Sequence, residues 1–241
     1  MCIRDRLNTV FLQLIVMIMS FAPLGVFCLI GKFVIADGLD IFQDVLAYVV
    51  LLIALLLFHA AFTYSLFLKF IGGLNPLTFY RKMKDVALFA FSTSSSAATI
   101  PVTLRTVNQD LGVNQNVASF VVPVGATINM DGTAIMQGLA TVFIAQMSGI
   151  DLTLFQYIQV VLLAVATSIG TAAVPSAGTI TLIIILQQFN LPLEAIGIIL
   201  AVDRVLDMIR TSVNVTGDAA IACIVAKTEN QLDENIFNSK A

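Results

Sequence analysis

The residues best suited to chemistry lie on one apolar helix near the end of the chain. In the run DRVLDMIRTSVNVTGD, polar side chains recur every three or four residues at Asp203, Asp207, Arg210, Asn214 and Asp218. At about 100° per residue these five share a face about 80° wide and extend over about 22 Å. A charge in the middle of a membrane costs at least about 2.5 kcal/mol, so this stripe must face protein or water.

Two interpretations of the stripe are open. Its charges can be satisfied ion pairs, such as Asp207 with Arg210 at a spacing of three residues. They can also line a track for a ligand and cations, because three aspartates against one arginine leave negative charge uncompensated. In that case Arg210 suits a carboxylate, to which a guanidinium donates two parallel hydrogen bonds, and Asp207 suits an ammonium. Both groups together fit an amino acid with an acidic side chain.

Further oxygen donors interrupt an apolar segment at 117–147. Asn129 and Asp131 lie in its centre, within the run NMDGT. With Asn214 and Asp218 of the stripe they supply hard oxygen ligands, which suit Na⁺ rather than a soft metal.

Composition indicates an all-α integral membrane protein. Of 241 residues, 59% are hydrophobic and only 11% are charged, with a mean hydropathy of +0.97, whereas a soluble domain carries about 25% charged residues. The net charge of −3, without a basic patch, argues against nucleic acid as a partner.

The only histidine, His59, is expected to be a packed, hydrogen-bonded helix residue. The cysteines match no metal or redox spacing and are expected to be inert: Cys2, Cys28 and Cys223.

Segments of about 20 apolar residues are long enough to span a bilayer. The chain offers four such spans, at 7–36, 45–70, 117–147 and 193–225. The third breaks at 129–133, and the last carries the polar stripe. Residues 1–6 are interpreted as an artefact or a cytoplasmic cap, and residues 228–241 as a polar cytoplasmic tail.

Two more apolar segments, 78–110 and 153–190, break at runs of small polar residues, 92–101 and 168–179. Each is followed by a long helix with an internal Asn and Asp. The positive-inside rule is satisfied if both segments are re-entrant hairpins that enter from opposite sides, which is an inverted repeat. Non-helical backbone inside a bilayer needs protein or a wet cavity around it, so both hairpin tips and the break at 129–133 should converge on one polar site. Two loops outside the membrane are the alternative.

Four motifs resemble the glutamate transporter family, the dicarboxylate/amino acid:cation symporters. They occur in the family's order: SSSAATIPVT (94–103), PVGATINMDGT (123–133), SIGTAAVPSAGT (168–179) and DRVLDMIRTSVNVTGD (203–218). The resemblance implies a multi-pass protein of the cell (inner) membrane, with eight spans and two hairpins. Here the amino-terminal spans are missing, since the chain matches spans five to eight. It also implies a homotrimer when full length, with 7–36 in a scaffold and 45–227 as a transport domain that moves as an elevator.

The resemblance also implies binding roles. Asp207 would hold the substrate ammonium and Arg210 its side-chain carboxylate. The rest of the substrate pocket would be Ser95, Ser96, Thr133, Val174, Pro175, Gly178, Thr211 and Asn214. Sodium ligands would be Gly125, Asn129, Asn214 and Asp218 at a first site, Thr127, Ser168, Ile169 and Thr171 at a second, and Asn129 with Asp131 at a third. The other ligands of the third site belong to a span absent here.

The expected function is sodium-coupled symport of glutamate or aspartate, with H⁺ as an alternative coupling ion. Dicarboxylate-specific relatives usually lack the aspartate matched by Asp207, and neutral amino acid carriers lack the arginine matched by Arg210. Ser94 and Met208 stand where relatives carry an arginine, which puts the contacts around Asp207 in doubt. Alternatives are a C4-dicarboxylate:cation symporter, a channel-like pore and an intramembrane hydrolase. No residue is placed as a base for the tip serines, so we expect no enzyme.

Overall fold

A computed structural model describes residues 41–239 without interruption, together with single positions between 10 and 35. The segment predicted at 1–6, and most of the span predicted at 7–36, lie outside the described residues. From 41 to 239 the regular elements are helices, apart from one isolated antiparallel bridge between Val113 and Leu232. This confirms the expectation of an all-α protein.

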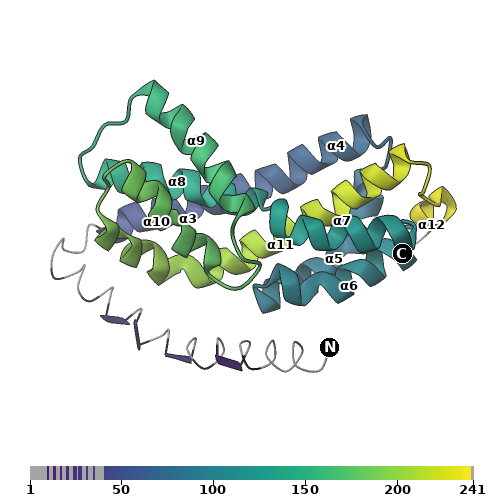
Figure 1. The fold of residues 1–241 in the computed structure, drawn as a ribbon, viewed down its shortest axis with the longest axis horizontal. Coiled ribbons are helices and arrows are strands. Elements are labelled where there is room, and N and C mark those ends of the chain that lie inside the picture. The colour runs from purple at the N-terminus through teal and green to yellow at the C-terminus, as the bar shows by residue number, and fades with distance from the viewer. Residues whose placement is uncertain are drawn as a thin grey trace.

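The first described span is a continuous rod of three pieces (Figure 1). They are α3 (Ile41–Phe58), the π-helical segment η1 (His59–Tyr64) and α4 (Ser65–Phe70). By length and composition, Phe42–Phe70 is the one helix among the described residues that could cross a membrane. Its most apolar window has a mean hydropathy of 2.7 and only 17% of it is buried. A surface this apolar and this exposed suits lipid or another apolar partner.

The first helix pair consists of α5 (Pro76–Thr93) and α6 (Ser96–Gln109). Ser94 ends α5 in the left-handed conformation, with φ 50°. The side chain of Ser95 then caps α6 by accepting a hydrogen bond from the backbone N–H of Ala98. The break therefore covers two residues, which is less than the predicted 92–101, because one serine ends a helix and the next begins another.

The other two breaks differ in length, and in neither does a side chain cap the helix that follows. The broken span consists of α7 (Gln115–Ile128) and α8 (Asp131–Met147), so only Asn129 and Met130 leave the helix, compared with the predicted 129–133. The second helix pair consists of α9 (Leu154–Ile169) and α10 (Ala177–Gln188). The loop between them, residues 170–176, is the longest of the three interruptions.

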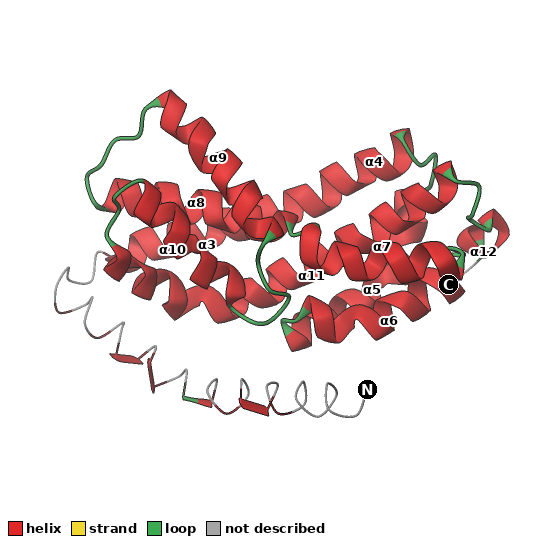
Figure 2. Cartoon of the chain, in the orientation of Figure 1, coloured by secondary structure: helices red, strands yellow, loops and turns green. Residues whose placement is uncertain are grey.

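The last long helix, α11 (Ile196–Thr228), follows the short η2 (Leu193–Ala195) and runs through the middle of the molecule (Figure 1). It packs against α3, α5, α6, α7, α8 and α10. In Figure 2 the turn of the first pair and the loop of the second pair both lie near the middle of the molecule, beside α11. The polar stripe of α11 is therefore buried among protein, as its charges require.

Residues 228–239 do not form the polar tail that the composition suggests. The short helix α12 (Glu234–Asn238) packs against α5, and its Phe237 is fully buried. Leu232 pairs with Val113, next to the turn that joins α6 to α7. Phe237, the packed side chain of Leu232 and the backbone pairing thus hold this polar segment against the helices.

Candidate functional site

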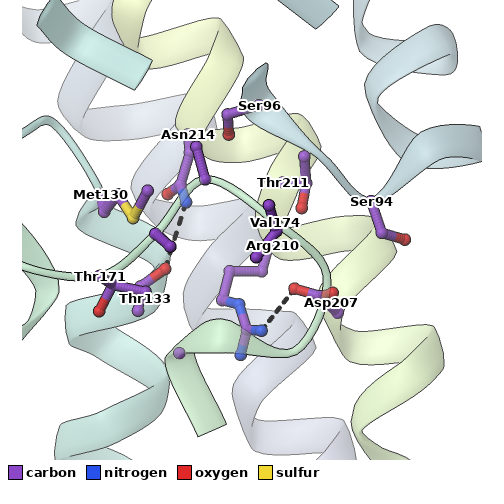
Figure 3. Close-up of a pocket in the computed structure, with 13 residues that line it drawn as sticks. Ser94, Ser96, Met130, Thr133, Thr171, Val174, Asp207, Arg210, Thr211 and Asn214 are labelled. Atoms are coloured by element: carbon purple, nitrogen blue, oxygen red, sulfur yellow. Dashed lines mark hydrogen bonds and ion pairs between the residues drawn. The ribbon is translucent and has the colours of Figure 1, made fainter. Parts of the chain in front are cut away.

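A small polar cavity lies where the tips of the two helix pairs meet α8 and α11 (Figure 3). The first tip, Ser94 and Ser95, contacts the second tip, residues 170–176. The carbonyl of Ala173 accepts hydrogen bonds from Ser95 Oγ at 2.9 Å and from the N–H of Ala97 at 3.3 Å. The lining residues are Ser94, Ser96, Met130, Thr133, Thr171, Ala172, Ala173, Val174, Gly178, Asp207, Arg210, Thr211 and Asn214.

The charges of the cavity belong to one buried cluster on α11. Arg210, which is 2% exposed, places Nη2 at 2.5 Å from Asp207 Oδ1 and Nη1 at 3.5 Å from Asp203 Oδ1. Thr179 Oγ1 donates to Asp203 Oδ1 at 2.7 Å, and the N–H of Ser176 donates to Asp207 Oδ2 at 2.9 Å. The ion pair of the first interpretation therefore forms, and both of its residues line the cavity.

The cavity has about 20 Å³ for the centre of a water-sized sphere, which is room for about one water molecule. A larger ligand needs the second tip to move and Arg210 to separate from Asp207. A ligand with a carboxylate and an ammonium would give each residue a new partner of the right charge. Separation without such a ligand would leave two buried charges uncompensated, which is strongly unfavourable.

Beside the cavity, the break between α7 and α8 faces the carboxylate of Asp218. Asn129 Nδ2 donates to Asp218 Oδ1 at 3.1 Å, and Asp218 is only 2% exposed. A Cβ on Gly125 would lie 2.6 Å from the same oxygen, so glycine allows the carboxylate to approach the backbone of α7. Among the described residues no cationic side chain pairs with Asp218. A buried anion among oxygen atoms suits a hard cation.

A second carboxylate lies against η1. Asp131 Oδ2 accepts a hydrogen bond from Tyr64 at 3.1 Å and lies 3.1 Å from His59 Nε2. The hydroxyl of Tyr64 fits only because residue 217 is a glycine, whose added Cβ would lie 2.5 Å from that oxygen. His59 is thus a hydrogen-bonded helix residue as expected. Its partner Asp131, 72 residues along the chain, has no signal in the sequence.

The structure brings most of the predicted substrate residues together. Ser96, Thr133, Val174, Gly178, Asp207, Arg210, Thr211 and Asn214 line the cavity. Ser95 and Pro175 do not, since Ser95 caps α6 and bonds Ala173, and Pro175 lies elsewhere in the second tip. Ser94 lines the cavity although it was not predicted, and its buried hydroxyl has no partner within the described chain. Its place in the serine run of the first tip was the available signal.

The structure brings some of the predicted sodium residues together, whereas Asp131 lies against Tyr64 and His59. Gly125, Asn129 and Asp218 contact one another, while Asn214 Oδ1 accepts from the N–H of Gly132 at 2.8 Å. The carbonyl of Ser168 accepts from the N–H of Thr171 at 3.1 Å, below the second tip. The side chains of Thr127 and Ile169 are exposed. No three His, Cys, Asp or Glu side chains gather as a metal site in the part of the chain that the structure describes.

Gln137 of α8 is a buried polar residue that sequence reasoning missed. Its Nε2 donates to the carbonyl of Gly178 at 3.0 Å and to Thr181 Oγ1 at 2.7 Å. Its Oε1 accepts from Thr167 Oγ1 at 2.8 Å. Because Thr167 lies on α9 and Gly178 on α10, one side chain ties both arms of the second pair to α8.

An apolar helical exterior around a buried, charged cavity defines a helical membrane protein with an internal polar site. Residues 2–228 match the family model of the sodium:dicarboxylate symporter family, and the chain belongs to this family. This confirms the resemblance carried by the four motifs.

The chain is also similar to known proteins that are named as amino acid transporters. The chain is 42% identical over 221 residues to excitatory amino acid transporter 2 of Homo sapiens, which covers 91% of this chain and 38% of that protein. It is 42% identical over 223 residues to excitatory amino acid transporter 1 of Mus musculus, covering 92% of this chain and 41% of that protein. An excitatory amino acid transporter of Caenorhabditis elegans is 41% identical, with 91% and 44% covered. The chain thus spans about two fifths of the length of these relatives.

Proposed function

We propose that this protein is a secondary active transporter that carries an acidic amino acid, glutamate or aspartate, by symport with sodium ions. The observation that carries the proposal is the buried pair of Arg210 and Asp207 in a cavity between two helix tips. Membership of a symporter family and the names of its relatives, excitatory amino acid transporters, support it.

In this proposal each end of the substrate has its own partner. Arg210 would turn from Asp207 to the side-chain carboxylate, and Asp207 would receive the ammonium. Thr133, Thr211 and Asn214 line the same cavity and would bind the remaining polar atoms. The exchange gives Arg210 and Asp207 each an oppositely charged partner, which is why a ligand with both groups is favoured over a simple dicarboxylate. A C4-dicarboxylate would leave Asp207 facing a second anion.

In this proposal sodium ions are substrates that cross the membrane together with the amino acid. Asp218 with Asn129 and the backbone of Gly125 supports one ion. The carbonyls around Ser168 and Thr171 support a second, directly below the tip that must move. Asp131 with Asn129 supports a third, for which further ligands would come from elsewhere in the full-length protein. A cation beside Asp218 would neutralise the one stripe carboxylate that Arg210 does not reach.

We also propose how the helices are arranged in the full-length protein. The first and second pairs would be re-entrant hairpins of an inverted repeat, and residues 45–227 a transport domain that moves as an elevator against a scaffold containing 7–36. The full-length protein would be a homotrimer in the cell membrane. The breaks at both tips support this, because interrupted helices at matching places are typical of a transporter's binding site.

An intramembrane hydrolase has no support at the tip serines. Ser95 Oγ donates to the carbonyl of Ala173, and the only histidine, His59, lies against Asp131 on the other face of α8's first turn. A serine nucleophile requires a base within hydrogen-bond reach.

The test is uptake of radiolabelled aspartate by the full-length protein in liposomes. Uptake should require an inward sodium gradient, and unlabelled glutamate should compete better than succinate. Uptake driven equally well by potassium would reject sodium coupling, a proton gradient that replaces sodium would favour H⁺, and equal competition by succinate would favour the dicarboxylate carrier.

A further inference from the structure

The carboxy-terminal residues 231–239, which we call the strap, cross the base of the first helix pair. The N–H of Asn114 donates to the carbonyl of Gln231 at 2.9 Å, and the N–H of Asp233 donates to the carbonyl of Gly112 at 2.8 Å. Phe237 of the strap is fully buried. The strap therefore adds backbone pairing and an apolar anchor to the turn between α6 and α7.

Lys82 of α5 fastens the strap from the other side. Its ammonium donates to the carbonyl of Asp110 at 2.8 Å, to the carbonyl of Ile236 at 2.7 Å and to Ser239 Oγ at 3.2 Å. An ammonium has three donors, and all three are used here on acceptors from two other segments. The neighbouring cation Lys84 is exposed and forms no ion pair or hydrogen bond to any residue that the structure describes.

Gly112 marks how closely the strap approaches the turn. Its φ is +74°, and an added Cβ would lie 2.5 Å from the carbonyl oxygen of Asp233. A side chain at this position must displace the strap. Gly73, at the start of α5, also has a positive φ, +61°, but an added Cβ there meets nothing within 4 Å. The two glycines share a backbone conformation and differ in contact with the strap.

The first pair is also fixed to α11 above its base. Ser212 Oγ of α11 donates to the carbonyl of Ala87 in the middle of α5 at 2.9 Å. Phe79 and Met83 of α5 are buried in the core. With the strap continuing directly from the end of α11, α5 is held to that helix at its middle and at its base.

We propose that the strap locks the first helix pair to α11, so that this pair cannot open from its base, and that Lys82 is the residue that positions the strap. The inference rests on the proposed transport function. A transporter whose two tips could both move would let substrate pass without sodium. Fixing one pair leaves opening to the other and so preserves coupling.

The test compares Lys82→Met with Lys84→Met in the full-length protein in liposomes. Lys82→Met should raise amide hydrogen exchange in α5 and α6 by at least about tenfold, since exchange reports local opening. It should also produce aspartate efflux without sodium, whereas Lys84→Met should match the unmodified protein in both. Gly112→Ala against Gly73→Ala provides an independent pair, with faster exchange at the base expected only for Gly112→Ala.

Two results separate the inference from the function on which it rests. If Lys82→Met and Gly112→Ala retain slow exchange in α5 and strict sodium dependence, the strap proposal is overturned while transport stands. If the unmodified protein takes up no aspartate, the transport proposal fails, and the exchange comparison alone still decides whether the strap holds the first pair.

Discussion

The two helix pairs meet at one cavity but are anchored in different ways. In the first pair, two serines form the whole tip, α5 packs along α11, and the strap covers the base. In the second pair, residues 170–176 form a longer tip, and α9 packs mainly on α8. A short tip on an anchored base resists opening, whereas a longer tip can move alone. The first pair is therefore the more firmly anchored of the two.

Exposure does not separate the two pairs. Large apolar side chains are open to the surroundings on both, with Leu154 at 78% and Phe155 at 67% on α9, and Leu77 at 73% and Leu88 at 66% on α5. The polar contacts differ more. Gln137 joins both arms of the second pair to α8, and bonds from Thr179 to Asp203 and from Ser176 to Asp207 join it to α11. The last of these bonds joins the second tip to the proposed ammonium site.

The largest expected effect comes from Arg210→Ala, which removes the charge that both aspartates of the cluster share. Aspartate uptake should fall by about 100-fold or more, since the carboxylate loses its partner and Asp203 and Asp207 are left buried and unpaired. Arg204→Ala is the matched control, because Arg204 is exposed on the same helix. The measurement is the uptake of aspartate and of serine by each variant. A variant that still prefers aspartate over serine contradicts the assignment of Arg210.

The next effect in size comes from Asp218→Asn, which removes the buried carboxylate beside Asn129. The sodium concentration for half-maximal uptake should rise by about tenfold or more, because the ion loses its charged ligand. Asp151→Asn removes an exposed carboxylate from the loop before α9 and should leave the sodium dependence unchanged. An unaltered sodium dependence in Asp218→Asn would place the ion elsewhere.

Arg210 and Asp218 could be identified from the sequence. A charge inside an apolar helix costs free energy, and the helical spacing shows which face of the helix carries it. The helices of the first pair, the broken span and the second pair were likewise predicted to within a few residues, since apolar runs and serine or glycine interruptions are local signals. The widths of the breaks were overestimated, because a single cap such as Ser95 restores the helix at once.

What the sequence did not reveal depends on contacts between distant segments. Asp131 meets His59 and Tyr64 only through a π-helical segment that re-aims both side chains. The strap depends on Phe237, the one fully buried residue of a mostly polar stretch, and on Lys82. In the sequence Lys82 cannot be distinguished from its neighbouring cations Arg81 and Lys84. Neither the contact of Asp131 with His59 and Tyr64 nor the packing of the strap follows from a hydrophobic period or a sequence motif.

A third prediction sharpens the comparison on the side of the second pair. Gln137→Ala deletes three hydrogen bonds that join α9 and α10 to α8 and leaves a buried gap, which should destabilise the second pair by about 2–3 kcal/mol. Hydrogen exchange should accelerate in α9 and α10 and stay slow in α5. Gln146→Ala, on the exposed end of α8, is the control. Equal acceleration in both pairs would mean that they are not independently anchored.

The smallest effect is expected at the middle of the first pair. Ser212→Ala removes the bond to the carbonyl of Ala87, but Ser212 Oγ also contacts the carbonyl of Met208 at 3.1 Å, so the net loss should be about 1 kcal/mol or less. If the strap is the main anchor, exchange in α5 should rise by less than about fivefold, well below the effect of Lys82→Met. The opposite order would move the anchor from the base of the pair to its middle.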